Sequence, residues 1–232
     1  MLQIRTWESL DGGYSHWLRA RRHFAIDGQG NPAHASLGSL VVWNDDEFAA
    51  HSGFAMHPHR DVEIVTYVRE GVLRHEDDSG GRGEIEAGSV QTISAGRGIR
   101  HSEFNDSDAP LRIFQIWFLP RRLGLDPHWA SKQFGDAQRA GLWVPLASGF
   151  PEDRDALQID ADARVLGTTL EAGERITYPL RSTRYGYLVP ARGRVIVNDT
   201  HVGERDGIAI TGESAIVIRA IEPAEILFAD AA

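Results

Sequence analysis

Residues 53–71 decide the fold and read GFAMHPHRDVEIVTYVREG. They place His57 and His59 just before the strand-like run 63–68. Side chains two residues apart point to opposite sides of a helix, whereas on a strand they share one face. A strand would therefore bring both imidazoles to one metal ion. Because Pro58 has no N–H to give to a central strand, we expect the motif at the start or the edge of a sheet strand.

A second stretch, residues 88–105, reads GSVQTISAGRGIRHSEFN and contains another pair two residues apart, His101 and Glu103. In the first stretch Glu63 follows His59 by four residues, so its parity predicts the same strand face. A lone His-x-His is usually a surface motif or part of a hydrogen-bonded core. Two such pairs beside strands of one β unit instead predict a metal site. Three imidazoles and a carboxylate leave coordination positions open, which favours iron, manganese, cobalt, nickel or copper over closed tetrahedral zinc.

The rest of the chain also has the pattern of strands. Short runs rich in Val, Ile, Thr and aromatic residues are separated by Gly, Asp and Asn, and the 24 glycines suit tight turns. These runs are 37–43, 63–68, 89–93, 111–118, 194–197, 207–211 and 214–218. The chain is therefore predicted to be all-β, as a sandwich or barrel.

Prolines and mixed charge in the segment 119–163 interrupt this rhythm. On each side of it, a strand enters a glycine turn and an acidic-glycine turn precedes a later strand, which indicates a duplicated β unit. The predicted division is an N-terminal domain with the metal site at 1–125, a connector at 126–163 and a C-terminal domain at 164–232.

An alignment of the two glycine turns, at Gly71 and Gly193, places Pro179, Arg181 and Tyr185 opposite His57, His59 and Glu63. None of these three residues can reproduce the ligand set. The second unit is therefore expected to carry no metal and to serve as a packing or pocket wall.

The composition excludes several classes of function. With 24 basic and 33 acidic residues the net charge is −9, which repels a phosphate backbone, so no direct nucleic-acid partner is expected. The chain has no cysteine, which removes thiolate zinc sites and iron–sulfur clusters. No apolar run reaches the ~18 residues of a membrane-spanning helix, and no secretory signal precedes the first strand. We therefore expect no membrane contact and a cytoplasmic location.

The two quoted stretches resemble the cupin superfamily and, more narrowly, the bacterial branch of the pirin family. The first cupin pattern, His-x-His followed by a glutamate and a glycine, is matched by residues 57–71. The second pattern is matched by His101 and Asn105, although Ser94 replaces its proline and the gap before the histidine is longer. The phrase SAGRGIRHSE at 94–103 is more specific to pirins than to cupins at large. The resemblance covers about residues 35–120 and implies two tandem cupin barrels of jelly-roll type, of which the first binds metal.

The pirin resemblance also implies a mononuclear iron-type site with three histidines and one glutamate. Carried over by position, these ligands are His57, His59, His101 and Glu103. Many other cupins use the glutamate that corresponds to Glu63, and spacing alone leaves both open; Glu103 is chosen because the pirin-specific phrase contains it. Glu63 is then expected beside the ligands, as a base, or as the ordinary partner of an arginine such as Arg60. The expected ion is Fe(II), with Mn, Co, Ni, Cu or Zn as alternatives.

Family resemblance further implies a metal-dependent dioxygenase similar to quercetin 2,3-dioxygenase. Its substrates would be dioxygen and a flavonol-like or other small hydroxylated aromatic compound, and Glu103 or Glu63 would remove the hydroxyl proton. The alternative is a non-enzymatic, metal-bound redox sensor or regulator with a protein partner, since eukaryotic pirins resemble transcription cofactors. A third possibility is a cupin isomerase or an inactive double barrel; the intact histidines argue against an inactive protein.

Overall fold

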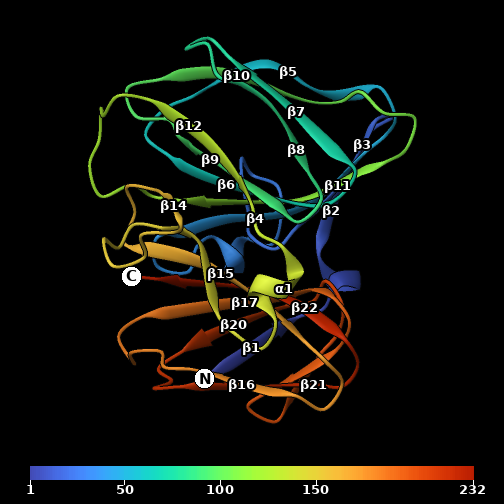
Figure 1. Cartoon of the computed structure of the whole chain (residues 1–232), viewed down its shortest axis with the longest axis vertical. Helices are drawn as coiled ribbons and strands as arrows, with labels where there is room; N and C mark the ends of the chain where they lie inside the picture. The colour runs from blue at the N-terminus through green and yellow to red at the C-terminus, as the bar shows by residue number, and fades with distance from the viewer.

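The computed structural model describes residues 1–232. The chain is almost entirely β, with strands in four sheets and one short α-helix, α1, over Asp136–Arg139. Two 3-10 turns lie at Trp7–Ser9 and Pro32–His34. The sheets form two halves, one above the other in Figure 1, and each half pairs a seven-stranded sheet with a four-stranded one. The prediction of an all-β chain with two tandem barrels is confirmed. No helix has the length and apolar character needed to cross a membrane.

The upper half in Figure 1 is the first barrel. Its seven-stranded sheet has the order β12-β9-β6-β11-β4-β3-β2, and its four-stranded sheet has the order β5-β10-β7-β8. All strand pairs in it are antiparallel. The strands are β2 (Asp11–Tyr14), β3 (Leu18–Arg22), β4 (Leu40–Phe48), β5 (Ser52–His59), β6 (Glu63–Glu70), β7 (Val72–Asp77), β8 (Arg82–Glu86), β9 (Ser89–Ser94), β10 (Ile99–Asn105), β11 (Leu111–Phe118) and β12 (His128–Gln133).

The second barrel repeats this plan. Its seven-stranded sheet has the order β1-β20-β17-β22-β15-β13-β14, and its four-stranded sheet has the order β16-β21-β18-β19. The strands are β1 (Leu2–Arg5), β13 (Val144–Ser148), β14 (Leu157–Gln158), β15 (Ala163–Leu170), β16 (Arg175–Tyr178), β17 (Tyr185–Arg192), β18 (Val195–Val197), β19 (Thr200–Val202), β20 (Gly207–Thr211), β21 (Ile216–Ala220) and β22 (Ala224–Ala231).

One strand of the first domain's stretch pairs with the second barrel, and the predicted connector supplies strands to both barrels. β1, at the start of the chain, pairs with β20 of the second barrel. β12, from the predicted connector, pairs with β9 of the first barrel, while β13 from the same segment pairs with β15 of the second. The boundaries 1–125, 126–163 and 164–232 stay a prediction, to which the structure adds that each barrel borrows strands from outside its main stretch.

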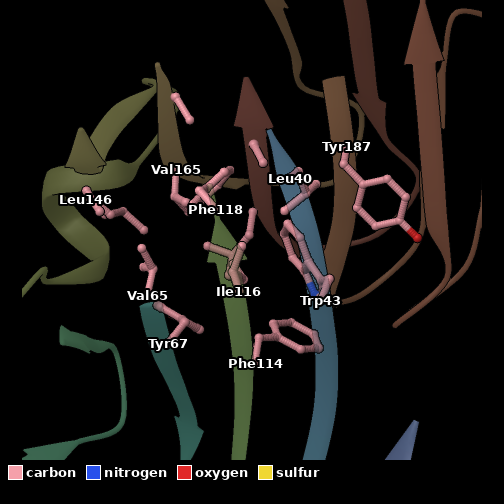
Figure 2. Close-up of a cluster of buried hydrophobic side chains, with 14 of the residues drawn as sticks. Leu40, Trp43, Val65, Tyr67, Phe114, Ile116, Phe118, Leu146, Val165 and Tyr187 are labelled. Atoms are coloured by element: carbon pink, nitrogen blue, oxygen red, sulfur yellow. The ribbon is translucent and has the colours of Figure 1, made fainter. Parts of the chain in front are cut away.

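The main hydrophobic core lies between the two seven-stranded sheets. It contains 23 buried residues from both barrels, so the halves share one core. Trp43 on β4 contacts Phe114 on β11 and Tyr187 on β17, with ring centroids 5.8 and 5.4 Å apart (Figure 2). Because side chains alternate along a strand, the residues between these point into the first barrel. The same strands therefore build the interface with one face and the site with the other.

The register of the second barrel differs from the sequence alignment. Tyr178 ends β16 opposite β21, just as His59 ends β5 opposite β10. The prediction that Arg181 stands opposite His59 is thus wrong by three residues, 181 − 178. The cause is loop length: β16 and β17 are joined by residues 179–184, whereas β5 and β6 are joined by residues 60–62 alone.

Candidate metal centre

Two of the predicted site residues lie at the end of β5, the edge strand of the four-stranded sheet. His57 and His59 are two residues apart on this strand, so their rings share a face as the spacing predicts. Pro58 between them is tolerated because one side of an edge strand forms no ladder hydrogen bonds. The expectation of an edge position agrees with this placement.

A third histidine comes from the neighbouring strand. His101 on β10 lies directly opposite His57 in the antiparallel ladder. The ring centroids of His57 and His59 are 4.8 Å apart, and that of His101 lies 4.4 Å from the first and 5.0 Å from the second. One nitrogen atom from each ring lies within 4.8 Å of the other two. Residues from two distant stretches thus form one triangle of imidazoles in the first barrel.

The hydrogen bond of His57 and the burial of His59 and His101 suit these rings to bind a metal. His57 Nδ1 lies 2.8 Å from the carbonyl oxygen of Ala55, and donating a proton there leaves Nε2 free. His101 is fully buried, and neither of its ring nitrogens has a hydrogen-bond partner. Burial and the neighbouring His57 lower the pKa of His59 to about 4, and burial chiefly lowers the pKa of His101. Neutral imidazole is the form of histidine that binds metals.

Glu103 lies two residues after His101 on β10 and is only 1% exposed. Its Oε1 accepts hydrogen bonds from Gln91 Nε2 at 2.5 Å and from Thr66 Oγ1 at 3.5 Å, and its Oε2 accepts one from Gln115 Nε2 at 2.7 Å. Burial raises the pKa of Glu103 to about 7, although these hydrogen bonds oppose the rise. No basic side chain pairs with this carboxylate, so a nearby cation would stabilise its ionised form.

The group whose donor atoms all lie within 4.8 Å of one another contains the three histidines and not Glu103. The β5–β10 pairing has a bulge between His101 and Glu103, which changes the register at this point. The role of Glu103 as a fourth ligand therefore stays a prediction.

Glu63 lies on another face of the barrel wall. It begins β6, which belongs to the seven-stranded sheet, after the chain has turned away from β5. Glu63 shares a strand face with Val65 and Tyr67, which pack into the core between the barrels. Its carboxylate accepts a 2.6 Å hydrogen bond from Ser94 Oγ. The expectation that Glu63 shares a face with His59 is wrong, because side chains alternate regularly only within one strand and the two residues lie on different strands.

A cavity of about 310 Å³ opens beside the histidines, a volume typical of a small ligand pocket. Its walls come from both sheets of the first barrel and from the segment between β3 and β4. The lining residues are Leu18, Ala20, Arg22, Ile26, Asp27, Gln29, Asn44, Asp46, Phe54, His57, His59, Gln115 and Trp117. The Trp117 ring meets the His59 ring edge to face at 5.0 Å, so the cavity is apolar next to the histidines.

Sequence reasoning missed the residues that hold Glu103. Thr66, Gln91 and Gln115 are polar residues at buried positions of β6, β9 and β11. A polar side chain at an inward position needs a partner inside the barrel, because an unpaired buried polar group is costly. Buried polar positions of this kind indicate hydrogen bonds inside the barrel. They do not identify Glu103 as the acceptor of all three.

The donors present fit a divalent transition-metal ion. Three imidazoles offer nitrogen atoms, and His101 has two buried nitrogens that no protein group satisfies. Glu103 adds a buried carboxylate without a cationic partner. Nitrogen and oxygen donors of this kind suit iron, nickel, copper, cobalt, manganese or zinc, and the cavity beside His57 and His59 leaves room for a further ligand.

Two family models match the chain. The model of the pirin family matches residues 4–118, and a model described as the quercetinase C-terminal cupin domain matches residues 146–231. The matches fall on the first and second barrels and agree with the resemblance drawn from the two stretches.

Full-length relatives show the same likeness. A pirin-like protein of Caulobacter vibrioides is 49% identical over 232 residues, with all of both chains covered. A quercetin 2,3-dioxygenase of Escherichia coli is 34% identical, with 99% of this chain and 98% of the relative covered. A crystal structure of a bacterial pirin from Escherichia coli in complex with nickel(II) superposes with a TM-score of 0.93 at 32% identity, covering 100% of this chain and 99% of the other.

Proposed function

Because this chain belongs to the pirin family, we propose that it is a metal-dependent dioxygenase that cleaves a flavonol or a similar small hydroxylated aromatic compound with dioxygen. The observation that carries the proposal is the triangle of histidines beside a partly apolar cavity. Relatives that carry the name quercetin 2,3-dioxygenase over their full length support the same reaction class.

The ligands in this proposal are His57, His59, His101 and Glu103. Fe(II) is the first ion to test and Ni(II) the second, because a solved relative holds nickel(II). When bound, the ion supplies Lewis acidity toward the substrate hydroxyl oxygen and a centre for the reaction with dioxygen.

The protein residues bind and orient the substrate. Phe54 and Trp117 line the cavity beside the histidines and keep water from the aromatic ring. Glu103 accepts the hydroxyl proton at one of its Oε atoms, because its carboxylate has no basic partner and a cation beside it favours the ionised form. Gln91 and Gln115 keep its two oxygens in place by their amide donors. Glu63 has no part in this scheme because it faces the core between the barrels.

The reaction is tested with purified protein loaded with Fe(II) or Ni(II). We expect the loss of quercetin absorbance to be coupled to oxygen consumption, and a chelator to abolish both. Protein that holds a full equivalent of metal and turns over no flavonol would contradict the dioxygenase proposal and favour a binding or sensing function.

The choice of carboxylate is tested by metal content. Glu103→Gln removes an anionic oxygen from the site, so we expect metal affinity to fall by at least about 10-fold. Glu63→Gln is the matched control, because it changes a buried carboxylate of the same barrel that faces away from the histidines. Retention of metal by Glu103→Gln with loss in Glu63→Gln would reverse the assignment.

A further inference from the structure

One row of side chains crosses the inner face of the large sheet in the first barrel. The row consists of direct cross-strand partners, each paired with the next across β3, β4, β11, β6 and β9: Arg22, Asn44, Gln115, Thr66 and Gln91. Every member has a polar side chain. A polar row of this length inside a barrel needs partners for each of its groups.

The two ends of the row differ in how their polar groups are satisfied. At one end Gln115, Thr66 and Gln91 all donate to Glu103. At the other end the buried Oδ1 of Asn44 accepts no hydrogen bond, and the Arg22 guanidinium forms no ion pair, although its charge partly opposes the rise that burial causes in the pKa of the nearby Asp46. Asp46, two residues along β4, is 2% exposed and its Oδ1 also has no partner.

This unsatisfied end faces the cavity. Arg22, Asn44 and Asp46 line it from the seven-stranded sheet, whereas His57 and His59 line it from the four-stranded sheet. The cavity therefore has the candidate metal ligands on one side and three polar groups without protein partners on the other. Unpaired polar atoms of this kind leave a place for the complementary groups of a ligand.

We propose that Arg22, Asn44 and Asp46 bind the hydroxyl groups of a substrate ring that lies away from the metal, so that the site selects polyhydroxylated over sparsely hydroxylated aromatic compounds. This inference rests on the proposed function and names its substrate class. A hydroxyl hydrogen donates to Asn44 Oδ1 or Asp46 Oδ1, and the guanidinium of Arg22 donates to a hydroxyl or phenolate oxygen.

The state of Asp46 suits this role. Burial, and next the charge of Asp45, raise the pKa of Asp46 to about 8. Its carboxyl group is thus largely protonated at neutral pH and has both an accepting and a donating oxygen. A site built for a hydroxyl rejects an analogue that lacks it, because its buried polar groups are then left unpaired.

The test is an equilibrium titration of the metal-loaded protein with two flavonols, followed by quenching of tryptophan fluorescence. Quercetin carries two hydroxyls on its pendant ring and galangin carries none, while both share the hydroxyl that would bind the metal. We expect quercetin to bind about 10-fold more tightly than galangin. The same pair is then compared by KM and kcat, where the preference is expected in KM.

Three variants locate the origin of the preference. Arg22→Met and Asp46→Leu remove polar groups at nearly constant volume, and each is expected to bring the two affinities to within about 3-fold. Asp46→Asn keeps an acceptor and a donor and is expected to retain most of the preference. Arg19→Met is the matched control, because Arg19 lies on the same strand with its side chain 53% exposed and outside the cavity.

The outcomes separate this inference from the proposed function. Equal affinity of the wild-type protein for both flavonols, or an unchanged preference in Arg22→Met and Asp46→Leu, would contradict the binding of substrate hydroxyls by Arg22, Asn44 and Asp46. The dioxygenase proposal would remain intact. Binding of neither flavonol by metal-loaded protein would overturn both. Metal content and the melting temperature of each variant show whether a lost preference comes from the removed polar group or from a destabilised barrel.

Discussion

Asp46 is the acid whose burial has the clearest consequence for stability. Its folded-state pKa is raised to about 8 from the ordinary 3.8, so the unfolded chain releases this proton at lower pH than the folded chain does. Below about pH 4 Asp46 is protonated in both the folded and the unfolded state, so it does not make the folding stability depend on pH. As the pH rises from there toward 8, the folded state keeps a proton that the unfolded state has lost, and folding stability falls.

Replacing Asp46 by Asn removes this dependence while it keeps the shape of the side chain. We expect the free energy of unfolding of Asp46→Asn to match the wild type near pH 4 and to exceed it increasingly up to pH 8. The difference grows by at most about 1.4 kcal/mol per pH unit. Urea denaturation of chelator-treated protein across this range measures it. A difference that does not change with pH would show that Asp46 ionises freely in the folded protein.

The residues of the candidate site were predictable from sequence to different degrees. His57, His59 and His101 follow from short spacings, since residues two apart share a strand face. Glu63 was misplaced because the chain turns between β5 and β6, and parity does not carry across a turn. The polar wall of Arg22, Asn44 and Asp46 could not be predicted, because it depends on which strands become neighbours, and β3, β4 and β11 are not all adjacent in sequence.

The pairing of β5 with β10 sets the distance between the histidines, and Gly53 allows these strands to approach. A Cβ atom at Gly53 would lie 2.2 Å from the carbonyl oxygen of Glu103 and 2.6 Å from the Cα of Phe104. Both contacts are with backbone, which cannot move without shifting β10. A side chain at this position must therefore push β5 away from the strand that carries His101.

We expect Gly53→Ala to lower the free energy of unfolding by about 1–3 kcal/mol and to weaken metal binding. The affinity falls because His57 on β5 separates from His101 on β10, although no ligand has been changed. Gly135→Ala is the control: a Cβ there meets nothing within 4 Å, so stability should change by no more than about 0.5 kcal/mol. Unaltered metal affinity in Gly53→Ala, measured by competition with a chromophoric chelator, would contradict the link between strand pairing and the site.

The order of strands was predicted less completely than their existence. The runs rich in Val, Ile, Thr and aromatic residues mark seven of the strands, namely β4, β6, β9, β11, β18, β20 and β21. The pairing of β1 with the second barrel has no such local pattern, because its partner β20 lies far away in sequence. The second barrel was misaligned by three residues, with Arg181 instead of Tyr178 placed opposite His59, for a similar reason. The length of the loop after β16 leaves the pattern of the neighbouring strands unchanged, so the sequence did not reveal it.

The shared core makes the two barrels one unit for unfolding. Its 23 buried residues come from both barrels, and the pairing of β1 with β20 adds backbone hydrogen bonds across the division. Loss of either barrel would expose this whole face of the other to water, at a cost of about 25 cal/mol per Å² of apolar surface. We therefore expect a single calorimetric transition whose van't Hoff and calorimetric enthalpies agree.

Trp43 tests this cooperativity without touching the site. It is fully buried at the centre of the interface, and its indole nitrogen has no hydrogen-bond partner, so Trp43→Ala removes packing alone. We expect a loss of about 3–5 kcal/mol with the single transition preserved and the metal content unchanged, because Trp43 lies on the face of β4 opposite Asn44. Leu123→Ala, at a side chain that is 72% exposed, should shift stability by less than about 0.5 kcal/mol. Two resolved transitions in either the wild type or Trp43→Ala would mean that the barrels fold independently and that the common core does not couple them.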